Sequence, residues 1–109
     1  MNFRELAGNL GLEEEEYLEL IALLVETGMD GLDTLRSAVE EGDAEQAADA
    51  AHSLKGAAVS LGLIELQDGA KAVEEKARDN QLKDIPAAAD ELKRMLEEIA
   101  RISRVGDEQ

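Results

Sequence analysis

The chain contains a single histidine, His52, and the residues around it predict what that side chain can do. With a rotation of about 100° per residue, His52 lies well round a helix from the apolar stripe that includes Leu54 and Ala58. Imidazole titrates close to neutral pH, so a large share of it is neutral and nucleophilic in a cell. A solvent-facing histidine on a rigid helix is therefore predicted to act as a nucleophile toward a molecule that docks there.

Beside His52 the same predicted helix carries a strip of small or apolar residues with one cation. The members of this strip are Ala48, Lys55, Gly56 and Val59. The strip is predicted to face solvent and to form part of the surface on which a partner docks. Glycine is unfavourable inside a helix, so Gly56 either clears room for that partner or allows a neighbouring helix to pack closely.

The run His52-x-x-Lys55-Gly56, followed by Ser60 and Gly62, resembles the signature of histidine-containing phosphotransfer (HPt) domains, the four-helix modules of bacterial and fungal phosphorelays. The resemblance implies that His52 accepts a phosphoryl group from a receiver-domain aspartate or a histidine kinase. The histidine would then pass the group to another receiver. Ser60 either contacts that partner or bonds back to its own helix.

Phosphoryl transfer requires a donor held in line, a magnesium ion and nearby positive charge. The sequence has no Gly-rich phosphate loop, Walker lysine or kinase motif. The resemblance implies that a receiver domain supplies both Mg²⁺ and the aspartyl phosphate, so no cofactor of the chain's own is expected. The expected partners are response-regulator receiver domains and a hybrid sensor histidine kinase. The chain itself is expected to be a phosphotransfer protein without a kinase or nucleotide-binding site.

The neighbours of His52 have predicted roles in the transfer. Lys55 lies about one turn away and can reach a phosphoryl group on the ring, unless it only solubilises the surface. Equal distances from Gly62 along two antiparallel helices bring Glu74 to the level of His52. Its carboxylate is predicted to accept the Nδ1–H and leave Nε2 free to attack, a part that a glutamine or glutamate plays in HPt domains. Arg78, one turn on, is predicted to add positive charge, and the alternative for both residues is a solvated charged face.

Four amphipathic stretches with short connections predict an all-α fold, an antiparallel up-down four-helix bundle with a short extra N-terminal helix. The predicted helices cover residues 13–41, 44–61 and 64–78, and a last helix is capped by Asp84 and ends near Ile102. A short helix over residues 2–9 is expected to cover one end of the bundle. The whole chain, 1–109, is expected to form one domain, with a frayed tail over residues 103–109.

Apolar stripes at 3-4 spacing predict which side of each helix is buried. The stripe of the long helix comprises Leu18, Ile21, Val25, Leu32, Leu35 and Val39, with Gly28 at the missing core position. The stripe of the last helix comprises Ala88 or Ala89, Leu92, Met95, Ile99 and Ile102. Four other apolar residues of the long helix either contact the N-terminal helix or take part in partner docking: Tyr17, Leu20, Leu23 and Leu24.

The composition limits the possible functions. The chain of 109 residues has a net charge of −15, so nucleic acid and anionic membranes would repel it. It has no cysteine and therefore no thiol or disulfide chemistry. Because the first residues lack a signal-peptide core, a cytoplasmic protein is expected. It is also expected to be a monomer. Two other classes of protein remain: a helical adaptor in which His52 is incidental, and the phosphoacceptor domain of a chemotaxis-type kinase. A metal-binding bundle is disfavoured, because Asp49 and His52 form only one acid-x-x-His pair.

Overall fold

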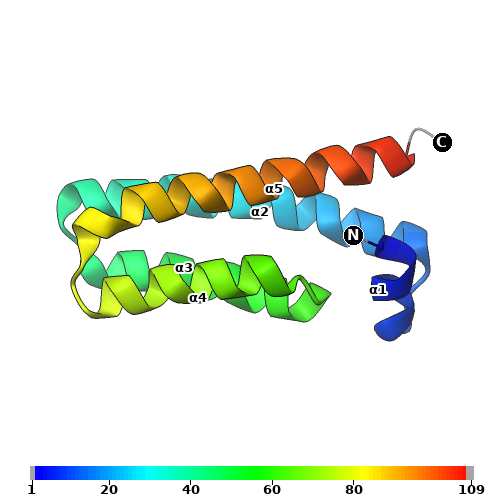
Figure 1. Ribbon diagram of the computed structural model, residues 1–109, viewed down its shortest axis with the longest axis horizontal. Coiled ribbons are helices and arrows are strands. Elements are labelled where there is room, and N and C mark those ends of the chain that lie inside the picture. The colour runs from blue at the N-terminus through cyan, green and yellow to red at the C-terminus, as the bar shows by residue number, and fades with distance from the viewer. Residues whose placement is uncertain (1, 108–109) are drawn as a thin grey trace.

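The structure is a computed structural model that describes residues 2–107 (Figure 1). Its helices are α1 (Phe3–Asn9), α2 (Glu14–Glu41), α3 (Ala44–Leu61), α4 (Ile64–Arg78) and α5 (Ile85–Asp107), with a 3-10 turn at Leu82–Asp84. Figure 1 shows α2 and α5 running alongside α3 and α4, while α1 crosses the end near the α3–α4 turn. The predicted all-α antiparallel four-helix bundle with a short N-terminal helix is confirmed.

Two glycines set the short turns on either side of α3. Gly42 and Gly62 have φ angles of 72° and 73°, the left-handed conformation that ends a helix at little cost only for glycine. Asp43 then caps the start of α3, where its side chain accepts a hydrogen bond of 3.0 Å from the backbone N–H of Gln46. These turns place α3 antiparallel to both α2 and α4, which determines the level at which their side chains meet.

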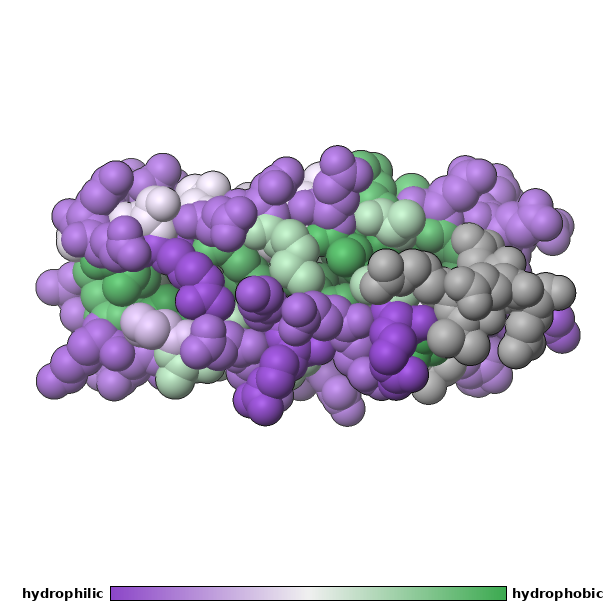
Figure 2. Space-filling view, turned by 90° about the horizontal axis from the view of Figure 1, so that it is seen from above, coloured by the Kyte–Doolittle hydropathy of each residue, from purple (hydrophilic) through white to green (hydrophobic). Residues whose placement is uncertain are grey.

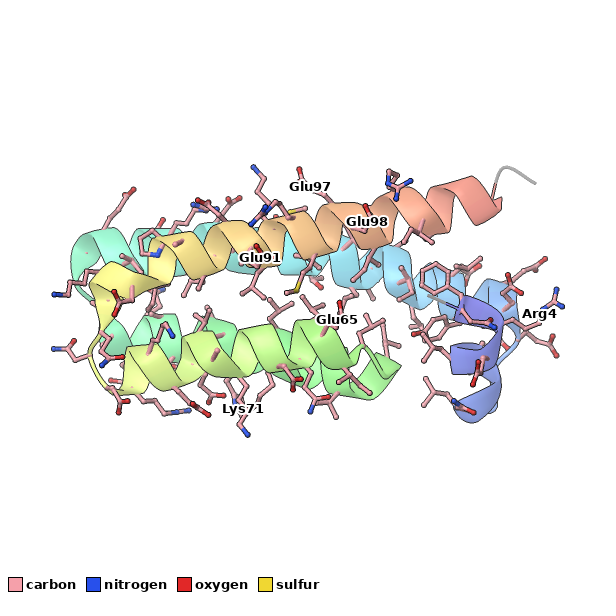
Figure 3. The ribbon with its side chains drawn as sticks, in the orientation of Figure 1. Arg4, Glu65, Lys71, Glu91, Glu97 and Glu98 are labelled. Carbon is pink, nitrogen blue, oxygen red and sulfur yellow. The ribbon has the colours of Figure 1, made fainter. Side chains whose placement is uncertain are left out.

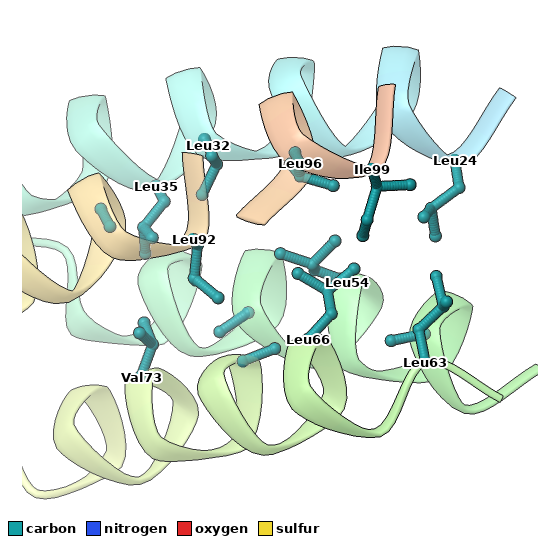
Figure 4. Packing of buried hydrophobic residues seen from close by; sticks show 14 of the residues in the cluster. Leu24, Leu32, Leu35, Leu54, Leu63, Leu66, Val73, Leu92, Leu96 and Ile99 are labelled. Atoms are coloured by element: carbon teal, nitrogen blue, oxygen red, sulfur yellow. The ribbon is translucent and has the colours of Figure 1, made fainter. Parts of the chain in front are cut away.

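Leucine, isoleucine and alanine side chains form one continuous core between the four long helices (Figure 4). The predicted stripes of α3 and α4 are buried; they comprise Ala47, Ala51, Leu54, Ala58, Leu61, Leu66, Ala70, Val73 and Ala77. On α5 the prediction omitted Leu96, which is completely buried, whereas Met95 is only half-buried. Both changes reflect a helix that faces α2 and α4 at once, so its buried sector is wider than one stripe.

The buried sector of α2 is rotated from the predicted one. Tyr17 and Leu24 are buried, whereas Leu18 and Val25 are only half-buried. The cause is tertiary: α2 packs against α3 and α5, and its first turns also contact α1. The Tyr17 ring lies 6.1 Å from that of Phe3 between centroids, and its hydroxyl donates to the main-chain carbonyl of Leu61. Tyr17 thus belongs to the core and connects α1, α2 and α3.

Two further apolar residues of α2 are not part of this core. Leu20 and Leu23 are 40% and 55% exposed, so contact with α1 does not account for them. They stay available for the docking role that the sequence analysis left open.

The C-terminal helix is longer than predicted. α5 continues to Asp107, whereas the sequence analysis ended it at Ile102 and expected a frayed tail from residue 103. At the start of this extension the hydroxyl of Ser103 donates a hydrogen bond of 3.0 Å to the carbonyl of Ala100, a contact that helical backbone allows. Residues 108 and 109 of the expected tail lie outside the described part of the chain.

The two glycines inside α2 have different surroundings and predict opposite mutational effects. A Cβ added at Gly28 would lie 2.9 Å from Cδ1 of Leu96, whereas one at Gly31 would have no neighbour within 4 Å. We expect Gly31→Ala to raise the free energy of unfolding by up to about 1 kcal/mol through helix propensity. Gly28→Ala should lose that gain to overpacking and end at least about 1 kcal/mol below Gly31→Ala. Urea unfolding of both variants measures the difference, and equal stabilities would contradict this account of Gly28.

Candidate functional site

The imidazole of His52 lies on the outside of α3 with one ring nitrogen held by the neighbouring helix. Its side chain is 62% exposed, and its Nδ1 lies 3.0 Å from Oε2 of Glu74 on α4. The turn at Gly62 brings these two positions to the same level, where the count along the antiparallel helices placed them. The carboxylate that faces the histidine is itself only 5% exposed.

Glu74 is contacted by two cationic side chains in addition to His52. Nζ of Lys55 lies 2.7 Å from its Oε1, and Nη2 of Arg78 lies 2.6 Å from its Oε2. A buried carboxylate is costly unless charged partners and hydrogen bonds compensate its lost hydration. This site supplies both, so Glu74 is a fixed anion and not part of a solvated charged face.

The hydrogen bonds from Lys55 and Arg78 lower the pKa of Glu74 to about 2, against the opposing effect of burial. The carboxylate is therefore ionised at neutral pH and can only accept hydrogen bonds. Since it faces Nδ1 of His52, the neutral imidazole must carry its proton on Nδ1. Nε2 then keeps its lone pair, and this is the nitrogen able to attack an electrophile.

The lowered pKa of Glu74 predicts a specific dependence of stability on pH. A carboxyl whose pKa falls from 4.5 to about 2 on folding stabilises the native state above pH 4.5, and that contribution disappears as the pH falls toward 2. We therefore expect the stability difference between the wild type and Glu74→Gln to be largest at neutral pH and to shrink steadily below pH 4.5. Urea unfolding of both proteins at pH 7, 4 and 2.5 measures it. A difference that does not change with pH would contradict the assignment.

The strip beside His52 is exposed over Gly56 and Val59, and Val59 is 52% exposed. A Cβ at Gly56 would meet nothing within 4 Å, so close packing of a neighbouring helix does not explain this glycine. The hydroxyl of Ser60 donates a hydrogen bond of 3.0 Å to the carbonyl of Gly56, the back-bonding that was one of its two alternatives. The surface around Gly56 is thus an open, shallow area directly beside the histidine.

Ala48 does not belong to this exposed strip, contrary to the prediction. It is only 3% exposed and forms part of the core. The physical reason is that α3 packs against both α2 and α4, so its buried sector extends past the stripe that a helical projection assigns to it. The side chain of Ala48 is a single methyl group, which is too short to extend past that contact into solvent. Ala48 is accordingly withdrawn as a partner-binding residue.

Two contacts of the site were not predicted from the sequence, the ion pairs of Glu74 with Lys55 and with Arg78. Lys55 was predicted either to reach an incoming phosphoryl group or to solubilise the surface, and its side chain is 27% exposed. The signal was available: Lys55 lies one helical turn from His52, so the count that placed Glu74 opposite His52 also placed it near Lys55. A phosphoryl group on His52 would have to compete with Glu74 for this ammonium.

Comparison with known proteins assigns the fold and site to a family. A sequence model of the Hpt domain matches residues 19–102, and the chain belongs to this family. The crystal structure of histidine-containing phosphotransfer protein B (HptB) from Pseudomonas aeruginosa PAO1 is similar at 28% sequence identity. That match has a TM-score of 0.84 and covers 97% of this chain and 92% of the other. No curated protein sequence matches the chain.

Membership of this family defines the general role of the chain. It is a phosphorelay intermediate of two-component signalling, and Hpt domains work with receiver domains and histidine kinases. No helix within residues 2–107 is long and apolar enough to cross a membrane.

Proposed function

We propose that His52 is the phosphoacceptor of this relay protein and that Nε2 is the attacking atom. The observation that carries the proposal is the contact of Nδ1 with the buried, ionised carboxylate of Glu74, on a ring whose other side is open to solvent. This contact holds the proton on Nδ1 and orients the ring before a donor arrives. Preorganisation of this kind lowers the barrier because the reacting nitrogen needs no reorientation in the transition state.

The transfer exchanges one phosphorus bond for another. Nε2 of His52 forms a bond to the phosphorus of a receiver's aspartyl phosphate, and the bond from phosphorus to the aspartate oxygen breaks to release the carboxylate. The reverse exchange, with a second receiver, regenerates the histidine. Lys55 and Arg78 stabilise the negative charge on the phosphoryl oxygens as it grows. Mg²⁺ belongs to the receiver in this scheme, and the chain contributes no cofactor of its own.

The partners that this scheme requires are response-regulator receiver domains, with a hybrid sensor histidine kinase as the source of the phosphoryl group. Such partners act in the cytoplasm, and one copy of this chain suffices for the exchange. The docking surface is the open area at Gly56 and Val59, with the exposed Leu23 of the adjacent α2 available to extend it.

A phosphotransfer experiment tests the proposal directly. The protein is incubated with a receiver domain carrying a radioactive aspartyl phosphate and Mg²⁺, and the label is followed into this chain. Label on a histidine is acid-labile and base-stable, which distinguishes it from an acyl phosphate. Label that never leaves the receivers tested, or an acceptor other than His52, would overturn the assignment.

The docking surface predicts an unusual response to salt. This chain has a net charge of −15 and receivers carry acidic groups around their aspartate, so attraction between the two surfaces as a whole cannot drive binding. Apolar burial contributes about 25 cal/mol per Å² and is insensitive to screening. We expect the affinity for a receiver to stay level or rise between low and moderate salt, and Val59→Asp to weaken it. Titration calorimetry at two salt concentrations measures both, and steep weakening with salt beside a harmless Val59→Asp would place docking elsewhere.

A further inference from the structure

A second surface lies at the end of the bundle where α1, the start of α4 and the second half of α5 meet. It is a groove with a volume of about 790 Å³, and it shares no residue with the His52 site. Its floor is apolar and buried, at Leu63, Leu66 and Ile99, and its walls include the half-buried Leu6 and Met95.

The groove leaves apolar surface uncovered at its edge. Ile64, the first residue of α4, is 68% exposed, the largest exposure among the large apolar side chains of the described chain. The groove spans Glu91 to Ile102 along α5, which corresponds to about 16 Å or three helical turns at 1.5 Å per residue. An apolar trough of this length matches one face of a short helix laid into it.

The rim of the groove carries more acidic than basic side chains. Four carboxylates line it, at Glu5, Glu65, Glu91 and Glu98, against one guanidinium, Arg94. Figure 3 shows where three of them lie, with Glu65 on α4 and Glu91 and Glu98 on α5. Glu91 and Glu98 have arginine partners on α5, whereas Glu5 and Glu65 form no ion pair with any side chain of the described chain.

This combination of an apolar floor and an acidic rim indicates the chemistry of the occupant. Seen from above α2 and α5, the molecule also shows apolar surface between charged side chains (Figure 2). A second copy of this chain would bring its own net charge of −15 against the acidic rim, and an anionic membrane would be repelled in the same way. A helix with apolar residues on one face and lysine or arginine on its flanks complements both features.

We propose that this groove binds a cationic amphipathic helix of a partner protein, with apolar side chains on Leu66 and Ile99 and basic side chains against Glu5 and Glu65. The groove and the His52 site share no residue, so such a helix would leave the phosphoacceptor itself uncovered. A partner or receiver that carries this helix would gain effective concentration at His52 without any change at the phosphoacceptor itself.

The experiment uses two synthetic 14-residue helical peptides of identical apolar pattern, one with lysine and one with glutamate at every polar position. The chain's three methionines supply the readout, through proteins labelled with ¹³C at the methionine methyl groups. Met95 lines the groove, and Met29 on α2 does not. We expect the lysine peptide to shift the Met95 methyl signal with saturation and to leave Met29 unchanged, while the glutamate peptide shifts neither.

Three variants locate the binding. Ile64→Asn removes the apolar side chain at the edge without changing the charge of the rim, and the exposure of this position leaves the fold intact. It should weaken the lysine peptide at least about tenfold while phosphoryl acceptance by His52 persists, and Glu65→Lys should weaken it as well. The matched control Val59→Asn, outside the groove, should bind the peptide as the wild type does.

Each other outcome overturns the proposal. Equal binding of the two peptides would show that the acidic rim does not select the occupant. A lysine peptide that leaves Met95 unshifted, or that is unaffected by Ile64→Asn, would show that it is held by charge attraction outside the groove. Light scattering that finds a wild-type dimer dissociated by Ile64→Asn would assign the groove to a second copy of the chain. Phosphoryl acceptance is measured separately on each variant, so a failure of the proposed relay function would be distinguished from a failure of the groove.

Discussion

His52→Gln is expected to abolish phosphoryl acceptance completely and to leave the bundle folded. His52 is the only histidine in the chain and its side chain is 62% exposed, so no other imidazole can take over the role and little packing is lost. Glutamine retains a side-chain N–H that can donate to Glu74, and Lys55 and Arg78 still compensate that carboxylate. The change in the free energy of unfolding should stay within about 0.5 kcal/mol, as for other exposed positions.

Two measurements check this expectation, transfer of label from a phosphorylated receiver and urea unfolding. The matched control is Glu74→Gln, which keeps the nucleophile but removes the anion that holds the proton on Nδ1. It should still accept the phosphoryl group, at a reduced rate. Label retained by the His52→Gln protein would refute the phosphoacceptor assignment, and a large loss of stability would show that the ring supports the fold.

Gly56→Leu is expected to separate stability from function. No atom lies within 4 Å of a Cβ at this exposed position, so a leucine side chain can extend into solvent and should stabilise α3 by about 0.5–1 kcal/mol through helix propensity. The same side chain projects into the open area beside His52. If a receiver docks there, its affinity should fall by at least about tenfold, equivalent to about 1.4 kcal/mol.

Lys55→Ala provides the opposite case and serves as the control for Gly56→Leu. It removes an ammonium that lies 2.7 Å from Glu74 and is predicted to contact the phosphoryl group. We expect slower transfer or a shorter-lived phosphohistidine, with receiver binding largely intact. Receiver affinity by calorimetry and transfer rate by rapid quench are measured on both variants. If both variants lost affinity equally, it would be wrong to assign phosphoryl-group charge to Lys55 and open docking space to Gly56.

The contacts of Glu74 connect these expectations. In the unphosphorylated protein the carboxylate binds His52, Lys55 and Arg78 together, and its low pKa reflects the two basic side chains. Any negative charge added to the ring must draw on the same ammonium and guanidinium. The strength of these ion pairs should therefore influence both how readily the phosphoryl group is accepted and how readily it leaves.

The sequence alone was enough to predict the helices α1 to α4 and to place Glu74 opposite His52. Local signals set the helix boundaries: the left-handed glycines at 42 and 62 and the Asp43 cap act through backbone geometry and a hydrogen bond between near neighbours. Because the turn at Gly62 is short, counting residues was enough to place Glu74 opposite His52. Such features depend on few residues and carry the same meaning in any fold.

The environment of individual residues was decided by the tertiary structure. Gly28 and Gly56 are both helix-interior glycines, yet one faces Leu96 at 2.9 Å and the other faces open space. Ala48 is buried, and α2 is rotated toward Tyr17 and Leu24, because each helix packs against two or more neighbours and not along a single stripe. Lys55 pairs with Glu74 because a buried carboxylate attracts every cation within reach. These outcomes depend on distances between helices, which a one-dimensional pattern does not contain.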